Sequence, residues 1–414
     1  MLRLWIIAAC AATAVFAEVD RFDNYKVFAV TPNTTAHLDL LRELGETENG
    51  FDLWNNPARL NAPVHIMVPP HRLYEFEEYM DVVGAHYTTY IEDVQKLIDA
   101  EKGPLQLRDG SFGWTSYYTL NEIYEWLESL AVKYPENVEV VVAGSTYEGR
   151  EIKGIKISFG SDNPGIFIEG GIHAREWISP ATVTYIINEL LTSTDPDVRE
   201  LADRHDWYIF PVFNPDGYVH THDSSRLWRK TRSRVSALCR GADPNRNWGF
   251  QWNTGGASSL PCVDTYAGSA PFSEIETKSA SEYIDSISDK FYAYISFHSY
   301  TQLLLIPYGH STEHLDNYDE LLEIGLIAAD ALQQRYGTTY TVGNIAETIY
   351  VATGASVDWV KATYNTPITY IYELRDLGQW GFLLPASQII PTGEETLDSL
   401  VAMFKAAKAR GHGV

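Results

Sequence analysis

The stretch Gly170-Gly171-Ile172-His173-Ala174-Arg175-Glu176-Trp177 directly follows an apolar run at residues 166–168, which we expect to form a buried strand. The two glycines predict a bend at the end of that strand. A bend is needed to bring His173 and Glu176 together, because residues three apart in an extended strand point to opposite faces. Imidazole nitrogen and carboxylate oxygen both bind zinc, so the pair is a candidate for part of a metal site. Most pairs at this spacing are ordinary surface residues, however, and the motif alone does not decide between the two interpretations.

The composition bounds the class of protein. The chain has 414 residues, of which 45% are hydrophobic and 21% charged, as in a well-packed globular protein. This length leaves room for two or three domains or for one large α/β domain. The formal net charge of −24 argues against nucleic acid or an anionic membrane surface as a partner.

The N-terminus has the pattern of a secretory signal peptide. Arg3 precedes an apolar run at residues 4–16 that is too short to span a membrane, and cleavage is expected after Ala17. We therefore expect residues 1–17 to be removed and the protein to be secreted into the extracellular space. The mature chain would keep Cys239 and Cys262, which are expected to pair in an oxidising compartment. Two buried free thiols are the alternative.

Residues 18–108 predict a small domain of their own. Strand-like and helix-like patterns over residues 25–91 follow the order strand, helix, strand, strand, helix, strand, which is typical of a ferredoxin-like α+β domain. A charged helical connector at residues 92–102 then leads into a segment rich in proline and glycine. Such exposed segments are where proteases cut, and Lys102 and Arg108 are the candidate sites for a trypsin-like enzyme. This arrangement favours a zymogen over an ordinary two-domain protein.

Residues 109–414 predict an α/β domain. Helical and strand-like patterns alternate, which indicates a mixed, mostly parallel sheet flanked by helices on both sides. Ligands of such sheets bind beyond the carboxyl ends of the strands, and His298 and Glu373 each stand at the end of a predicted strand. Two histidines and one glutamate would leave zinc a position open for water, as in a catalytic site. Glu373 would then accept a proton from that water, or it pairs only with a neighbouring arginine.

A series of motifs in matching order resembles the pancreatic-type zinc metallocarboxypeptidases, the carboxypeptidase A/B family. The motifs are residues 173–177 (HAREW), 226–232 (RLWRKTR), 243–248 (DPNRNW), 297–300 (FHSY), 348–350 (TIY), 373–376 (ELRD) and 381–387 (GFLLPAS). The resemblance extends from residue 110 to near the C-terminus, and the N-terminal domain resembles the family's activation domain. It implies a carboxypeptidase-like fold and a zinc-dependent exopeptidase that is made as a zymogen and inhibited by its own prodomain.

The resemblance also implies the reaction centre. One Zn²⁺ would be held by His173, Glu176 and His298. Glu373 would act as the general base and later as the acid, and Arg229 would stabilise the oxyanion that exists only after attack on the peptide bond.

Further residues would bind the substrate, a peptide or protein C-terminus. Asn245, Arg246 and Tyr350 would capture the free terminal carboxylate, to which a guanidinium can form two hydrogen bonds. Asp243 would orient His173. More distant subsites would be lined by Arg175, Tyr300 and Phe382. For Arg175, as for Arg226, a structural ion pair is the alternative.

The resemblance places Val357 at the floor of the pocket for the terminal side chain. An apolar residue there disfavours lysine or arginine, which would be buried without a counter-charge, and indicates the A type. Ala355 and Ile371 would narrow the pocket and favour aliphatic over large aromatic residues. A non-catalytic zinc-binding protein is the rival class, which Glu373 and Arg229 oppose.

The remaining expectations concern the setting of the enzyme. They are activation by a trypsin-like protease, a monomeric state and a digestive role, with the gut lumen as a possible location.

Overall fold

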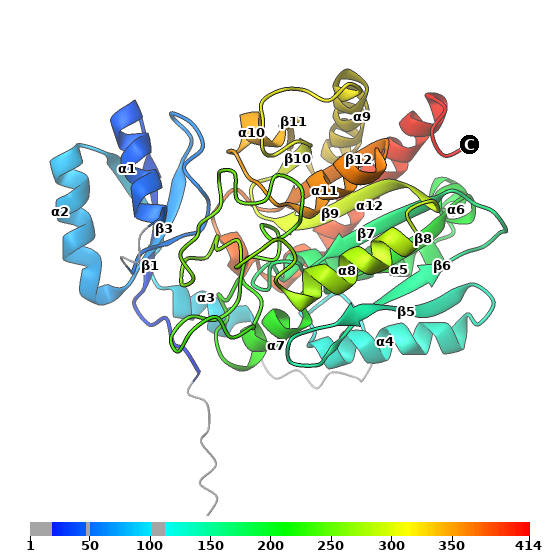
Figure 1. Cartoon of the computed structure of the whole chain (residues 1–414), viewed down its shortest axis with the longest axis horizontal. Helices are drawn as coiled ribbons and strands as arrows, with labels where there is room; N and C mark the ends of the chain where they lie inside the picture. Colours follow the sequence, from blue (N-terminus) through cyan, green and yellow to red (C-terminus); the bar gives the residue numbers. More distant parts are fainter. Residues whose placement is uncertain (1–18, 47–49, 102–111) are drawn as a thin grey trace, which may run out of the picture.

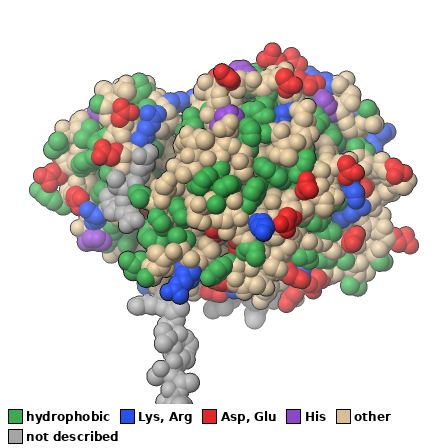
Figure 2. Space-filling view, viewed as in Figure 1, with side chains coloured by type: hydrophobic (Ala, Val, Ile, Leu, Met, Phe, Trp, Pro, Cys, Tyr) green, Lys and Arg blue, Asp and Glu red, His purple; other side chains and the backbone are tan. Residues whose placement is uncertain are grey.

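The computed structural model describes residues 19–46, 50–101 and 112–414, and it shows a smaller N-terminal unit packed beside a larger one (Figure 1). The expected signal peptide and the candidate cleavage residues Lys102 and Arg108 lie outside the described residues. Acidic side chains are spread over both units, as Figure 2 shows for one face, and do not gather in one patch there.

The smaller unit has the expected ferredoxin-like order. Its elements are β1 (Lys26–Thr31), α1 (Thr35–Glu46), β2 (Asp52–Leu53), β3 (Val64–Val68), α2 (Leu73–Val83), β4 (His86–Ile91) and the connector helix α3 (Val94–Glu101). The strands form an antiparallel sheet in the order β2-β3-β1-β4. Because side chains alternate along a strand, Phe28 of β1 packs with α1 and α2, whereas Val27 packs with the larger unit.

An eight-stranded mixed sheet forms the centre of the larger unit. Its strands are β5 (Val138–Ser145), β6 (Glu151–Ile157), β7 (Gly165–Gly170), β8 (Asp206–Phe210), β9 (Phe291–Ser299), β10 (Leu303–Ile306), β11 (Thr341–Asn344) and β12 (Ile368–Leu374). The spatial order is β11-β10-β12-β9-β7-β8-β6-β5. The central strands β8, β7, β9 and β12 run parallel, and antiparallel pairs join β6 to β8, β5 to β6 and β10 to β12. The predicted mixed, mostly parallel sheet is therefore confirmed.

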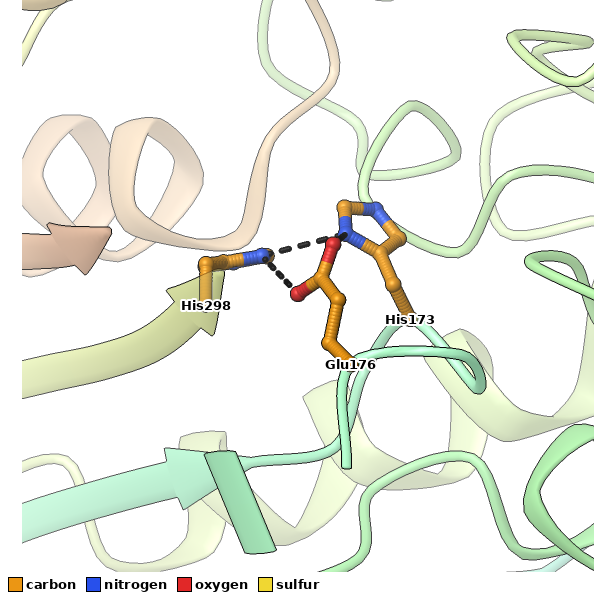
Figure 3. A group of neighbouring side chains, drawn as sticks. All are labelled: His173, Glu176 and His298. Atoms are coloured by element: carbon orange, nitrogen blue, oxygen red, sulfur yellow. Dashed lines mark hydrogen bonds and ion pairs between the residues drawn. The ribbon is translucent and has the colours of Figure 1, made fainter. Parts of the chain in front are cut away.

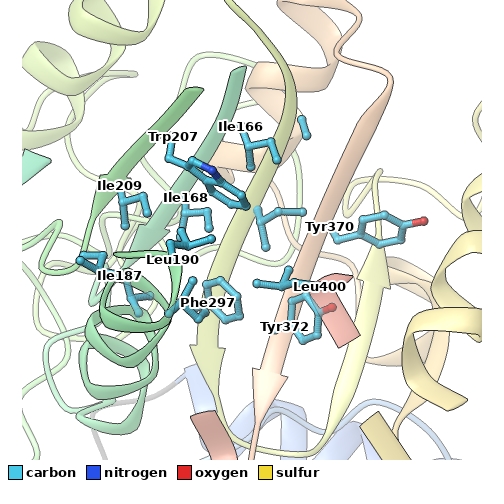
Figure 4. Packing of buried hydrophobic residues seen from close by; sticks show 14 of the residues in the cluster. Ile166, Ile168, Ile187, Leu190, Trp207, Ile209, Phe297, Tyr370, Tyr372 and Leu400 are labelled. Carbon is cyan, nitrogen blue, oxygen red and sulfur yellow. The ribbon is translucent and has the colours of Figure 1, made fainter. Parts of the chain in front are cut away.

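Helices cover both faces of this sheet. One face packs against α4 (Leu120–Lys133), α5 (Ile178–Thr192), α9 (Tyr318–Tyr336) and α12 (Ile389–Ala409). Figure 4 shows the core of that face, where Ile168 and Phe297 of adjacent strands meet Ile187 and Leu190 of α5. The other face packs against α8 (Ile275–Ser286) and α11 (Ser356–Tyr364), with Phe167, Tyr294 and Ile371 pointing toward it. The remaining helices are α6 (Pro196–Asp203), α7 (Pro215–Asp223) and the short α10 (Ile345–Thr348).

Helix α12 begins earlier than its pattern predicts. The amphipathic pattern predicts a helix over residues 396–408, whereas α12 also includes Pro391 and Gly393, which are poor helix formers. Pro391 nevertheless lies in the first turn, where its missing N–H is not needed. At Gly393 a Cβ would lie 2.5 Å from the ring of Tyr185, so close packing with α5 explains the glycine.

A long segment without regular helices or strands, residues 224–274, connects α7 to α8. The predicted disulfide between Cys239 and Cys262 closes part of it. Loops of this length in a compact domain are usually functional, and this one carries Arg229, Asp243 and Asn245.

Candidate active site

The bend after β7 brings His173 and Glu176 together. Gly171 adopts a φ of +63°, which favours glycine, and at Gly170 a Cβ would lie 2.8 Å from the side chain of Val183. The chain therefore turns sharply under α5. As a result, His173 Nδ1 lies 2.8 Å from Glu176 Oε1, and both side chains are buried.

His298 completes this group from the end of β9. Its Nδ1 lies 3.1 Å from His173 Nδ1 and 3.1 Å from Glu176 Oε2, as Figure 3 shows. The backbone N–H of Ser299 also donates to Glu176 Oε2. One nitrogen from each histidine and one carboxylate oxygen lie within 4.8 Å of one another, so the three side chains can hold one metal ion.

The donor set and its support fit zinc. Two imidazole nitrogens and a carboxylate are zinc ligands, and three protein ligands leave a coordination position open. His173 Nε2 lies 3.1 Å from Asp243 Oδ1, so its proton is directed to that carboxylate and the Nδ1 lone pair is left for a metal. The Nδ1 atoms of His173 and His298 lie 3.1 Å apart, close enough for both to bind the same cation.

Asp243 links the histidine to Arg229. Arg229 donates to Asp243 Oδ2 from Nε at 3.1 Å and from Nη2 at 2.9 Å, and its Nη1 lies 3.7 Å from Glu176 Oε1. Burial favours the neutral acid, but Arg229 and His173 together hold the pKa of Asp243 well below its usual range. The carboxylate therefore stays charged and keeps both partners oriented.

Glu373 lies beside the metal-ligand group. In the parallel pair of β12 and β9, Glu373 is the direct partner of His298, so the two side chains project from the same face of the sheet. Burial raises the pKa of Glu373 above its ordinary value. His298 opposes this shift, and the negative charge of Glu176 adds to it.

A second polar group near the metal-ligand residues consists of Asn245, Arg246 and Tyr350. Arg246 Nη2 donates to Tyr350 Oη at 2.9 Å, while its Nε and Nη1 donate to the carbonyls of Gly256 and Asn245. The backbone N–H of Ser356 donates to Asn245 Oδ1 at 3.0 Å. The guanidinium is held by backbone and by tyrosine rather than by a carboxylate, so it remains able to bind an anion.

These groups share a cavity of about 480 Å³. Its catalytic-domain lining includes His173, Glu176, Arg229, Asn245, Arg246, His298, Tyr300, Tyr350, Glu373 and Phe382. Ala355 and Ile371 also line it, next to Ile345 and Leu303. The structure therefore gathers on one cavity most of the residues that the sequence proposed.

Two of the proposed substrate-binding residues lie elsewhere. Val357 is completely buried and packs in the core between the sheet and α11, outside the set of residues that line the cavity. Arg175 is 2% exposed, and its Nη1 lies 3.3 Å from Asp52 and 3.2 Å from Asp264, with its guanidinium over the ring of Phe382. In this structure Arg175 therefore forms ion pairs, with Asp52 and Asp264, as the alternative interpretation from the sequence expected.

Sequence reasoning missed the contribution of the N-terminal domain to this cavity. Residues of the β2–β3 connection and its flanks line it, among them Trp54, Asn55, Asn56, Ala58, Arg59, Ala62, Pro63 and His65. His65 Nδ1 lies 2.8 Å from Tyr300 Oη, and Trp54 packs on Phe382 with ring centroids 5.3 Å apart. The sequence Asn55-Asn56-Pro57 is typical of a turn. That this turn lies over the cavity is visible only in the tertiary structure.

Comparison with known proteins agrees with this geometry. Residues 123–399 match the family model described as zinc carboxypeptidase, and residues 28–101 match the carboxypeptidase activation peptide. A protein named Zinc carboxypeptidase A 1 from Anopheles gambiae is 46% identical over 98% of this chain and 95% of its own length. Carboxypeptidase A1 of Mus musculus is 39% identical over 98% of both chains. The solved structure of carboxypeptidase A from Helicoverpa armigera superposes with a TM-score of 0.85 at 30% identity, covering 94% of this chain and 99% of that one.

A metal-ligand triad in a cavity closed by an activation domain, found together with these similarities along nearly the whole chain, establishes the relationship. The chain belongs to the zinc carboxypeptidase family and is a metallocarboxypeptidase made with an activation domain.

Proposed function

We propose that this zymogen, once activated, removes apolar residues one at a time from the C-termini of peptides, with Glu373 as the general base. The observation that carries the proposal is the convergence of the His173–Glu176–His298 group, Glu373 and the Arg246–Tyr350 pair on one cavity. Metal ligands and a base alone would suit many hydrolases. Because the Arg246–Tyr350 pair on the same cavity can bind an anion, the preferred substrate is a peptide whose C-terminal carboxylate lies in this cavity.

Recognition begins with the terminal carboxylate. Arg246 can present its guanidinium to both carboxylate oxygens, and the Asn245 amide adds a further donor. Tyr350 precedes the turn at Gly354, and its hydroxyl accepts a hydrogen bond from Arg246 Nη2. We expect the Tyr350 side chain to move when a substrate carboxylate takes over this hydrogen bond. The scissile bond is thereby held beside Glu373.

Zinc held by His173, Glu176 and His298 would supply Lewis acidity and lower the pKa of a coordinated water. Glu373 would take a proton from the attacking water on its carboxylate and later give it to the leaving amine. Arg229 lies on the side of Glu176 and Asp243, where its guanidinium can stabilise the negative charge that develops on the carbonyl oxygen.

The pocket for the terminal side chain is lined by apolar residues. Leu303, Ile345, Ala355 and Ile371 line the cavity, and Val357 backs them in the core. The neighbouring Asp358 is buried, accepts from the backbone N–H of Gly309, lies 3.9 Å from His310 Nδ1 and is not among the residues that line the cavity. An aliphatic terminal residue therefore fits this pocket better than a cation or the largest aromatics.

The activation domain blocks the site in the intact chain. Trp54 and His65 contact Phe382 and Tyr300, two residues proposed for the more distant substrate subsites. Asp52 meanwhile pairs with Arg175. Cleavage by a trypsin-like protease near Lys102 or Arg108 would free the domain and open the cavity.

The setting of the enzyme is also proposed. The signal-peptide pattern supports secretion, and the similarity to carboxypeptidases A supports a digestive role in a gut lumen, with the enzyme acting as a monomer. Among the described residues, no helix is both long and apolar enough to cross a membrane.

A hydrolysis assay tests the proposal. Blocked dipeptides ending in Leu, Phe or Arg are compared before and after trypsin treatment, with and without a zinc chelator. We expect activity only after trypsin, in the order Leu, Phe, Arg, and loss of activity with the chelator. Equal activity before trypsin would contradict the zymogen, a preference for Arg would contradict the apolar pocket, and cleavage of a dipeptide amide as fast as the acid would contradict carboxylate recognition.

A further inference from the structure

We infer that Glu169 is a positioning residue for the carboxylate-binding site and that it fixes the direction of the Asn245 amide through Ser356. The inference rests on the proposed function and extends it to a residue outside the cavity. Glu169 lies in β7 and is completely buried, and Ser356 Oγ donates to its Oε1 at 2.6 Å. Ser356 is the first residue of α11 and is also completely buried.

Ser356 in turn holds Asn245. Its backbone N–H belongs to the first turn of α11, where N–H groups have no partner within the helix. The preceding residue, Ala355, has no side chain that could cap the helix, and the N–H donates instead to Asn245 Oδ1 at 3.0 Å. The amide oxygen of Asn245 therefore accepts a hydrogen bond from α11, and its Nδ2 is the amide atom that can donate to a group in the cavity.

The surroundings of Nδ2 leave it available to a ligand. Nδ2 lies 3.3 Å from His298 Nε2. His298 Nδ1 faces His173 and Glu176, so when Nδ1 binds a metal the proton resides on Nε2, which then cannot accept from Nδ2. The free acceptor that Nδ2 requires is then a group in the cavity, such as the terminal carboxylate. A flipped amide would instead turn its oxygen toward that carboxylate and repel it.

A structural role alone gives a weak account of Glu169. Among the described residues Glu169 Oε2 lacks a hydrogen bond of standard length and angle, and the group that interacts with the carboxylate besides Ser356 is the phenol of Tyr294, which carries no positive charge. The neighbours of Glu169 on the same face of the sheet are polar: Ser296 is its partner in β9, and burial together with the charge of Glu169 raises the pKa of the Tyr294 phenol well above its usual range. An apolar side chain would avoid the cost of burying a carboxylate, so a use beyond packing accounts for its presence.

Binding of a leucine analogue without an amine tests this positioning. The probe is 4-methylpentanoate, the control ligand is its amide, and both are titrated by calorimetry into the trypsin-activated, zinc-loaded protein. We expect Glu169→Leu to weaken binding of the acid by roughly tenfold, the loss expected for one hydrogen bond to a charged group, and to weaken binding of the amide, whose carbonyl oxygen accepts only a neutral hydrogen bond, by a smaller factor. KM for a blocked dipeptide ending in Leu should rise by a similar factor while kcat changes little. Glu169→Gln keeps an acceptor for Ser356 Oγ and should retain wild-type binding.

Two further variants keep the test decisive. Ser356→Ala removes only the hydroxyl and should reproduce the effect of Glu169→Leu, so it carries the test if the latter does not fold. Glu276→Leu, which removes another buried carboxylate from α8, should bind the acid as the wild type does. Unchanged acid binding in Glu169→Leu or Ser356→Ala, or an equal loss for acid and amide, would overturn the inference. Failure of the proposed function looks different, because the activated wild type would then neither bind the acid nor hydrolyse the dipeptide.

Discussion

Glu101 and Arg226 form a doubly hydrogen-bonded ion pair between the two domains, with Nε–Oε2 and Nη2–Oε1 distances of 2.7 and 2.8 Å. Both side chains are almost completely buried, at 2% and 5% exposure. Arg226 also donates to the carbonyls of Arg175 and Phe382. Glu101 is the last residue of α3, so the pair connects the end of the activation domain to the long segment of residues 224–274 in the larger unit.

Removing the charge of Glu101 should loosen the activation domain. In Glu101→Gln, Arg226 stays buried without a charged partner, which costs about 3–5 kcal/mol for such pairs. After trypsin treatment we expect activity to appear faster than in the wild type, with the same final kcat/KM, because Glu101 leaves with the domain. Glu92→Gln is the matched control, since its pair with Lys26 is exposed and lies within the activation domain. An activation rate equal to the wild type would show that this pair does not hold the domain.

Inhibition by the activation domain should weaken at low pH through His65. Burial at the interface lowers the pKa of His65 to about 4, whereas a free histidine titrates near ~6.5. The neutral ring is therefore required in the closed state: its contribution is complete above pH ~6.5 and is lost as pH falls toward 4, by roughly 30-fold in affinity at pH 5.

Asp52 has the opposite effect, because burial and the charge of Asp264 raise its pKa to about 6 in the closed state. His65 is isolated by comparing the wild type with His65→Gln, which keeps a polar contact to Tyr300 but does not titrate. The ratio of activity in the uncleaved to the cleaved protein is measured from pH 4.5 to 7.5. The variant should lose the acid-side rise in this ratio, and parallel curves for the two proteins would refute the role of His65.

Glu373→Gln should stop turnover without preventing binding. The amide cannot take the proton, and loss of a general base lowers kcat by about 10²–10⁴-fold. The contacts of Arg246 and Asn245 to the substrate are untouched, so affinity for 4-methylpentanoate should be retained. Near-normal kcat in the variant would remove Glu373 from its assigned role.

Asp243→Asn should weaken metal binding. The substitution removes the charge that accepts from His173 Nε2 and pairs with Arg229, and loss of such a partner costs about 10- to 100-fold in metal affinity. Zinc retained against increasing concentrations of a chelator gives the measurement. Asp264→Asn is the control, because Asp264 pairs with Arg175 and not with a metal ligand. Identical zinc retention in wild type and Asp243→Asn would argue against this orientation.

Ile371→Val should widen the pocket by one methylene. Ile371 lines the cavity, and a difference of one methylene in a hydrophobic pocket changes discrimination by about tenfold. We expect kcat/KM for dipeptides ending in Phe, relative to Leu, to rise by up to that factor. Ile284→Val, on the buried face of α8, makes the same chemical change away from the cavity and should leave the ratio constant.

Local patterns predicted much of the architecture. Strands such as β7 and β9 are apolar runs with turn signals at their ends, and the helices of the activation domain have a regular apolar spacing, so their type and order follow from the sequence. The sequence did not predict several short elements of the larger unit, namely β10, β11, α6, α7, α10 and α11. Helix α11 carries Asp358 and Lys361 among its apolar residues, and its capping comes from Asn245, more than a hundred positions away. Such a cap leaves no local signal.

The residue types in the sequence set the chemical capacity of this protein: the side chains of His173, Glu176 and His298 can bind zinc, the carboxylate of Glu373 can accept a proton, and the guanidinium of Arg246 can bind an anion. The positions of these side chains relative to one another depend on the tertiary structure. Strand pairing sets Glu373 beside His298, domain docking directs Asp52 to Arg175 and His65 to Tyr300, and packing puts Val357 behind the pocket wall while Ala355 and Ile371 face the cavity. These are contacts between residues far apart in the chain, and they depend on the packing of whole elements rather than on any local pattern.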